Sequence, residues 1–117
     1  MCKKAKMIAL NHRGQLSFCE KCKMYHLIFN NLYIDFTPSE LISFQNIVED
    51  IDSEYWETKY NETFMRRKIP IQTSQQNLCM IFNRDELDSL KELITYNKKN
   101  PYRILSILDI YYNPFLN

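Results

Sequence analysis

Two cysteines and a histidine lie close together near the start of the chain, in the segment SFCEKCKMYH (residues 17–26). Cys19 and Cys22 are separated by two residues, and His26 follows four residues after the second cysteine. A C-x-x-C pair at the tip of a hairpin is typical of a zinc knuckle, in which two thiolates bind one metal ion. The chemistry that this segment predicts is therefore metal binding.

A tetrahedral zinc site needs two ligands beyond the C-x-x-C pair, and these must come from elsewhere in the chain. The candidates are His26 on the following strand, Cys2, His12 and Cys79. No second C-x-x-C motif exists, so the sequence carries half of a zinc-binding pattern. Lys23 also stands where zinc knuckles often have a glycine, which lets backbone N–H groups approach the sulfur.

Thiol chemistry at Cys19 and Cys22 is the main alternative to a metal site. A redox-active C-x-x-C pair normally lies at the N-terminus of a helix, where the helix dipole lowers the thiol pKa. Here the flanking segments are predicted strands. A nucleophilic Cys22 activated by His26 would need an oxyanion hole and a third orienting group, and neither can be identified. The sequence thus favours a protein that is not an enzyme and indicates no catalytic residue; a thiol-dependent redox protein or enzyme remains the alternative.

A second group of candidate binding residues lies in the segment RRKIPIQTSQQN (residues 66–77). Its cations can contact phosphates and its amides can pair with base edges, which gives a weak nucleic-acid-binding protein as a second alternative. The net charge of +1 argues against it, because nucleic-acid-binding domains are usually strongly basic. The competing interpretation is a solvated loop whose Arg66 and Arg67 pair with the acidic residues that precede the segment. The candidate residues are Arg66, Arg67, Lys68, Gln75 and Gln76.

Trp56 is a further candidate for binding, because it lies beside Tyr55 and Tyr60 in a segment expected to form a short helix capped by Ser53. Such a cluster usually belongs to the core of a domain. If it were exposed, Trp56 would anchor a protein partner, since Trp and Tyr dominate interface hot spots.

The elements that position these residues follow from the hydrophobic pattern. Apolar runs at residues 16–19, 25–29 and 32–36 predict an antiparallel meander, and the adjacent Asn30 and Asn31 suit a tight hairpin turn. Thr37, Pro38 and Glu40 then predict the start of a helix, as N-cap, first helical position and capping-box partner. Its apolar residues recur at helical spacing to residue 51, so one face should be buried.

The second half of the chain resembles the first. Residues 77–93 align with residues 31–47 at a constant offset of 46, with six identities and no gap. We expect either two similar strand–strand–helix units, about 14–51 and 66–97, or a chance likeness between two capped helices that each follow a strand. Both predict one α+β domain over residues 1–117, an antiparallel sheet with helices on one face.

Residues 101–117 form an apolar extension that needs cover. It is expected to dock on its own domain or, through Ile104, Leu108 and Tyr111, on a protein partner or a second copy of the chain. No segment approaches the roughly 20 apolar residues of a membrane span, and the N-terminal apolar run is too short for a signal peptide. The sequence therefore predicts a cytoplasmic protein whose cysteines are thiols or metal ligands.

Several of these motifs occur together in one known family. Cys2, the C-x-x-C pair and the segments RRKIPI, QQNL and FNRDEL resemble a small bacterial family of unknown function. The resemblance runs from Cys2 to about Tyr96, and the tail after Asn100 extends past the family's usual end. It implies that the first three cysteines belong together, which ranks Cys2 above His12 as a ligand, and it implies no activity. We therefore expect a binding or interaction module with a structural zinc, whose ligands are Cys2, Cys19, Cys22 and His26.

Overall fold

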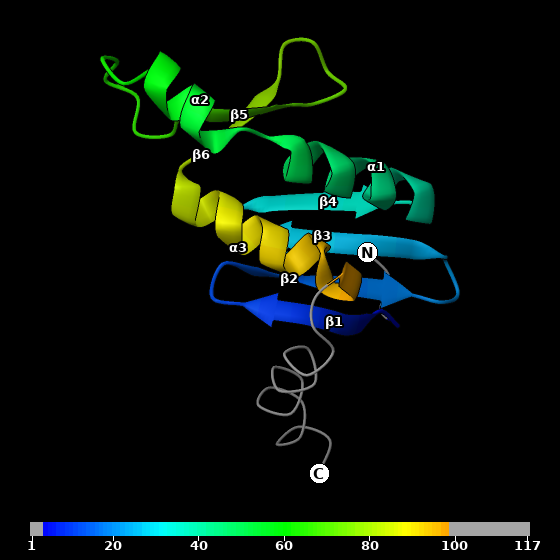
Figure 1. Ribbon diagram of the computed structural model, residues 1–117. Coiled ribbons are helices and arrows are strands. Elements are labelled where there is room, and N and C mark those ends of the chain that lie inside the picture. The colour runs from blue at the N-terminus through cyan, green and yellow to red at the C-terminus, as the bar shows by residue number, and fades with distance from the viewer. Residues whose placement is uncertain (1–3, 99–117) are drawn as a thin grey trace.

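Four strands form an antiparallel sheet, here called the main sheet (Figure 1). They are β1 (Lys6–Asn11), β2 (Gly14–Cys19), β3 (Met24–Phe29) and β4 (Leu32–Phe36), and each pairs with the next along the chain. The computed structural model describes residues 4–98. The three predicted strands of the meander are confirmed, and β1 adds an edge strand before them.

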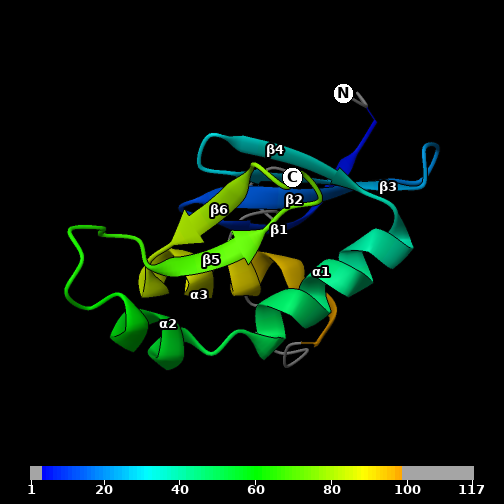
Figure 2. The ribbon, with the colours of Figure 1, turned by 90° about the horizontal axis from the view of Figure 1, so that it is seen from above.

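Two longer helices cover one face of the main sheet (Figure 2). These are α1 (Pro38–Asp50) and α3 (Arg84–Ile94), while the short α2 (Ser53–Lys59) lies at the end of the molecule beside the hairpin of β5 (Ile69–Gln72) and β6 (Cys79–Phe82). A 3₁₀ turn, η1 (Tyr96–Lys98), follows α3. The hairpin forms a two-stranded sheet separate from the main sheet. The predicted α+β class, with helices on one face of an antiparallel sheet, is confirmed.

The tight turns are made almost without glycine. Asn30 takes the positive φ of the β3–β4 turn, 52°, and Asn31 does not need one. In the β1–β2 turn the side-chain oxygen of Asn11 accepts hydrogen bonds from the backbone N–H groups of Arg13 and Gly14. Gly14 is required there for space, because a Cβ atom on it would lie 1.9 Å from the backbone oxygen of Ile28.

The helices begin at their side-chain caps. Thr37 and Glu40 form the predicted capping box of α1, and Asn83 and Glu86 form the matching one of α3. The short helix was expected to be capped by Ser53, and this was wrong by one residue. Its N-cap is Asp52, whose carboxylate accepts a hydrogen bond from the N–H of Tyr55.

The core lies between the main sheet, α1, α3 and the β5–β6 hairpin. One row of the sheet that contributes to it joins Leu16, Leu27 and Ile34 across three strands. Because side chains alternate along a strand, the neighbouring row of Ser17, His26 and Asp35 faces away from the helices. The buried apolar residues are Leu16, Leu27, Phe29, Phe36, Leu41, Phe44, Val48, Ile69, Ile71, Phe82, Leu87, Leu90, Leu93 and Ile94.

The two halves of the chain share the order strand, strand, helix, as β3–β4–α1 and β5–β6–α3. Their first strands differ in context, since β3 lies inside the main sheet and β5 does not. A duplicated unit therefore stays a prediction, as do the single domain over the whole chain and the docking of Ile104, Leu108 and Tyr111, which lie outside the described residues. No helix within residues 4–98 is both long and apolar enough to cross a bilayer.

Candidate functional site

The turn between β2 and β3 holds the C-x-x-C pair in a defined geometry. The N–H of Lys23 donates to the carbonyl of Cys19 at 2.8 Å, and the N–H of Cys22 approaches the Cys19 sulfur at 3.4 Å. Lys23 takes a φ of 57°, the left-handed conformation for which a glycine was expected. The lysine thus does not prevent a backbone N–H from reaching the sulfur. Cys19 is fully buried and Cys22 is exposed.

His26 and Cys19 lie on the same face of the main sheet. Ser17 pairs directly with His26, and Cys19 pairs with Met24, so the cysteine and the histidine are diagonal neighbours on adjacent strands. Neighbours of this kind are close enough for long side chains to meet. The sheet register therefore returns His26 to the side of the C-x-x-C turn, the point that strand alternation left open in the sequence.

One edge of the His26 ring is held by β4. The Nδ1 atom lies 2.6 Å from a carboxylate oxygen of Asp35 and 3.0 Å from the hydroxyl of Tyr33. A carboxylate can only accept, so Nδ1 carries the proton of the shorter hydrogen bond. This hydrogen bond lowers the pKa of the Asp35 carboxyl below its ordinary value of 3.8.

The other ring nitrogen of His26 is buried without a partner. Nε2 has no hydrogen-bond partner among the described residues, and His26 as a whole is only 9% exposed. In a neutral imidazole whose Nδ1 is protonated, Nε2 carries a lone pair. A buried lone pair without a donor is uncommon in native proteins, and it fits a bound group that accepts electrons.

The described part of the chain does not by itself assemble a metal site. Within residues 4–98, no three side chains of His, Cys, Asp or Glu are placed together to hold an ion. Cys2, a predicted ligand, lies outside the described residues. The strand that follows Cys2 in the chain, β1, begins at the end of the sheet that holds the C-x-x-C turn, because Lys6 pairs with Phe18, next to Cys19.

Asp35 and Tyr33 were missed as partners of His26, although the sequence contains the signal. A two-residue turn at Asn30 and Asn31 pairs Phe29 with Leu32, and counting back along both strands then pairs His26 with Asp35. The register of a predicted hairpin therefore gives the carboxylate that holds the histidine.

The cations of the central segment are largely occupied by their own chain. Nε of Arg67 donates to the buried carboxylate of Glu86 at 2.7 Å, and the ammonium of Lys68 donates to the carbonyl of Met65 at 2.6 Å. Arg66 is exposed. Two of the three cations predicted to contact a ligand thus donate to acceptors of their own chain near β5, and ligand binding by the three cations stays a prediction.

The loop that follows is held by short-range hydrogen bonds. The side chain of Gln72 donates to the carbonyls of Gln75 and Leu78, and the hydroxyl of Thr73 donates to Leu78 at 2.6 Å. The side chains of Gln75 and Gln76 are exposed at its tip. These amides are therefore accessible to solvent, and their predicted role in binding stays a prediction.

Trp56 was predicted to be either a core residue or an exposed anchor for a protein partner, and its burial is intermediate between the two. It is half-buried and packs against the core, and it contacts Tyr55 and stacks on Tyr60. The ammonium of Lys59 lies 5.1 Å from the Trp56 ring centroid. Tyr55 is the more exposed ring of the cluster, at 52%.

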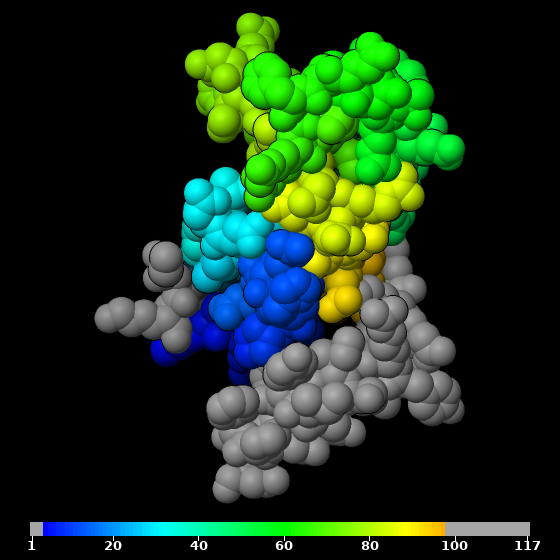
Figure 3. Space-filling model, turned by 90° about the vertical axis from the view of Figure 1, so that its left-hand side faces the viewer, coloured from blue at the N-terminus to red at the C-terminus, as the bar shows by residue number. Residues whose placement is uncertain are grey.

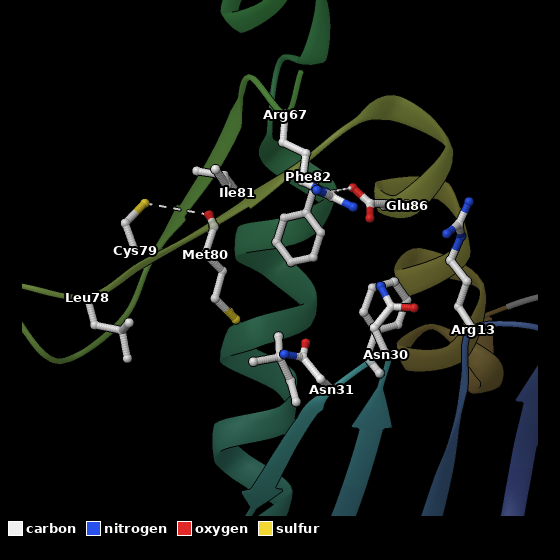
Figure 4. Close-up of a pocket in the computed structure, with 12 residues that line it drawn as sticks. Arg13, Asn30, Asn31, Arg67, Leu78, Cys79, Met80, Ile81, Phe82 and Glu86 are labelled. Carbon is white, nitrogen blue, oxygen red and sulfur yellow. Dashed lines mark hydrogen bonds and ion pairs between the residues drawn. The ribbon is translucent and has the colours of Figure 1, made fainter. Parts of the chain in front are cut away.

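A groove that the sequence did not predict runs between β4 and the β5–β6 hairpin, and we call it the β4–β6 groove. One part, of about 550 Å³, is bordered by Arg13, Asn31, Arg67 and Glu86 (Figure 4). The other part, of about 470 Å³, is bordered by Asp35, Glu40, Phe44, Ile47 and Thr73. Both share Leu32, Leu78 and Met80, so they adjoin. Figure 3 shows a notch in the surface between the β3–β4 hairpin, in cyan, and the β5–β6 hairpin, in yellow-green. Such a groove depends on tertiary placement, for which a single sequence holds no local signal.

Comparison with known proteins decides the family. A model of the family of unknown function DUF6686 matches residues 1–117. The chain belongs to this family. The match includes residues 101–117, so the expectation that the tail extends past the family's end was wrong, while the expected membership in a small family of unknown function is confirmed. Neither the curated proteins nor the solved structures give a match to this DUF6686 chain.

Proposed function

We propose that this DUF6686 protein is a zinc-binding interaction module without enzymatic activity, in which the metal is structural. The observation that carries the proposal is the buried, unpartnered Nε2 of His26, whose ring is held through Nδ1 by Asp35. Zinc-binding histidines almost always donate their other ring N–H to a carboxylate, a carbonyl or water. The hydrogen bond from Nδ1 of His26 to the Asp35 carboxylate is such an arrangement.

The cysteine turn supplies the second line of support. Cys19 lies on the same sheet face as His26, and a backbone N–H already approaches its sulfur, as in a zinc knuckle. Cys22 lies three residues further in the same turn, where it can offer a second thiolate. The proposed fourth ligand is Cys2, which is only four residues before the start of β1. An extended chain of that length reaches about 13–14 Å, and β1 begins opposite Phe18, the residue before Cys19.

A closed site of three thiolates and one imidazole would join the segment before β1 to the β2–β3 turn. Zinc in such a site contributes folding free energy and carries out no reaction. The face that holds His26 is opposite the apolar core, so the metal would secure an end of the sheet that core packing does not.

The redox alternative has less support in the geometry. A redox-active thiol pair depends on a helix N-terminus to lower its pKa, and Cys22 lies in a turn between two strands. The nucleic-acid alternative loses Arg67 and Lys68 to contacts within the chain.

The zinc affinity of matched variants tests the proposal. The full chain and its variants are titrated with zinc against a chromophoric chelator. We expect His26→Ala to weaken binding about 100-fold or more, because it removes a ligand. His12→Ala, which removes the exposed histidine of the β1–β2 turn, should leave the affinity unchanged.

The cysteines offer a second matched pair. Cys22→Ser should weaken zinc binding as His26→Ala does, whereas Cys79→Ser, on the exposed surface of β6, should not. Equal affinities for all four variants and the wild type would show that any bound zinc lies elsewhere.

A further inference from the structure

Two strand edges face each other across the β4–β6 groove without pairing. Among the described strands, β4 pairs only with β3 and β6 pairs only with β5, and the two run in roughly opposite directions (Figure 2). An unpaired strand edge presents a row of N–H and C=O groups that can hydrogen-bond to another chain. The groove is therefore bounded by backbone hydrogen-bonding groups on both sides.

The outer edges of β1 and β5 carry features that block strand pairing, and the edges of β4 and β6 lack these particular features. The outer edge of β1 carries Lys6 and a shift in register between Met7 and Ala9, and β5 carries Pro70. Lysine, irregular register and proline are the features that natural proteins use to block edge pairing. Neither β4 nor β6 has a lysine, a proline or a register shift. The two edges at the groove thus lack these three features, and the one charged residue on either strand is Asp35 of β4.

The walls of the groove offer apolar surface. Met80 and Phe82 point from β6 to the side on which Asn30 and Asn31 lie, while Cys79 and Ile81 point the other way (Figure 4). Leu78, at 55% exposed, and Ile47, at 49%, border the groove and are among the most exposed large apolar residues described. Both parts of the groove have volumes typical of binding sites.

The charges at its two ends are opposite in sign. Arg13 and Arg67 border one end with Glu86, which leaves an excess positive charge, and Asp35 and Glu40 border the other end. The positive end lies at the start of β4 and the negative end at its close. An extended peptide whose carboxylate lies at the positive end would consequently run antiparallel to β4.

We propose that the β4–β6 groove binds an extended apolar peptide of a partner protein, which inserts as a strand between β4 and β6. Its length would match these strands, four to five residues. Backbone pairing supplies the attachment and alternate side chains enter the apolar wall, which is the mode of β-strand addition. The peptide places a carboxylate near Arg13 and a cationic residue near Asp35. The groove contains none of the proposed metal ligands, and Asp35, which borders it, is the residue that it shares with the zinc proposal.

The test is a selection of peptides by the full chain. A library of random decapeptides with free C-terminal carboxylates is displayed on phage, and the best-enriched sequence is synthesised and its binding measured by fluorescence anisotropy. We expect enrichment of alternating apolar residues followed by the carboxylate. Methylation of alternate backbone nitrogens in the peptide should abolish binding in either of the two registers, because alternate N–H groups of an inserted strand pair with β4 and with β6.

A matched pair of variants locates the binding. Leu78→Lys, in the groove, should weaken the selected peptide about tenfold or more, as loss of a buried apolar contact does. Ile42→Lys alters a residue of equal exposure, 56%, on α1 outside the groove and should change nothing. Failure to enrich any peptide, as when the chain's own residues 99–117 fill the groove, would overturn the proposal. So would equal binding by the two variants, or binding that tolerates methylation in either register.

Discussion

At the scale of single residues, His26 is the centre of this account. Its Nδ1 is held by Asp35 and its Nε2 is buried without a hydrogen-bond partner among residues 4–98, so in a neutral ring Nδ1 carries the proton and Nε2 a lone pair. The carboxylate follows from the register of the β3–β4 hairpin, which places Asp35 directly opposite the histidine. The burial of Nε2 depends on the assembled sheet and has no signal in composition or spacing.

Asp35 is therefore predicted to act as a positioning residue for zinc binding. Asp35→Asn should lower zinc affinity about 10–100-fold, the range found for partners that orient a metal-binding histidine. Asp35→Glu should restore part of that affinity, whereas Asp88→Asn, an exposed aspartate on α3, should not change it. The measurement is zinc titration alongside thermal unfolding of the metal-free protein. Equal loss of stability and affinity would instead indicate a purely structural role.

At the scale of elements, α1 and α3 are joined by one buried polar contact. The side chain of Gln45, 1% exposed, donates to the carbonyl of Ile94 at 2.6 Å. This carbonyl is among the last of α3, where no intrahelical N–H is available to satisfy it. Gln45 thus closes the C-terminal end of α3 from a neighbouring helix.

Gln45→Leu keeps a side chain of similar volume but removes the donor to the buried carbonyl of Ile94. We expect it to destabilise the protein by about 1–3 kcal/mol, because that carbonyl is left without a hydrogen bond. Urea unfolding followed by circular dichroism measures the change. Ser43→Ala, at an exposed position of the same helix, serves as the control and should fall within about 0.5 kcal/mol of the wild type. A Gln45→Leu protein as stable as the control would refute this role of the amide.

The ion pair between Arg67 and Glu86 fastens the approach to β5 onto α3. The hydrogen bond from Arg67 lowers the pKa of Glu86 below its ordinary value of 4.5. A carboxyl group whose pKa is lower in the folded state stabilises the fold at pH values above the unfolded pKa. That contribution is lost as the pH falls below 4.5 and through the folded pKa.

Glu86→Gln should therefore flatten the dependence of stability on pH between about pH 5 and 3 relative to the wild type. Urea midpoints measured at intervals across this range provide the comparison. Glu62→Gln, which alters an exposed glutamate outside this pair, is the control for general loss of negative charge. Parallel curves for the wild type and Glu86→Gln would contradict the lowered pKa.

At the scale of the whole molecule, the architecture could be predicted from sequence and the site only in part. The strands, the capping boxes and the helical face of α1 are encoded by local patterns, such as Thr37 with Glu40 and the repeated apolar spacing. The separation of β5 and β6 from the main sheet, and the groove that results, depend on how distant elements pack. Local periodicity does not contain that information.

The candidate site shows the same division. The types and spacing of Cys19 and Cys22 indicated a metal, and the structure adds that a backbone N–H reaches the first sulfur. The sequence could not show that His26 is buried, because burial is a property of the assembled sheet. The sequence suggested acidic partners before the arginines in the chain, whereas Arg67 pairs with Glu86, 19 residues after it.

The most direct test of the central claim is the zinc content of the full-length protein purified without chelator. Elemental analysis and native mass spectrometry of the same sample give the number of ions per chain. The account predicts one zinc per 14.2 kDa chain in the wild type, and loss of that zinc in His26→Ala with retention in His12→Ala. A wild-type chain without stoichiometric zinc, which also takes up none when zinc is supplied, would contradict it.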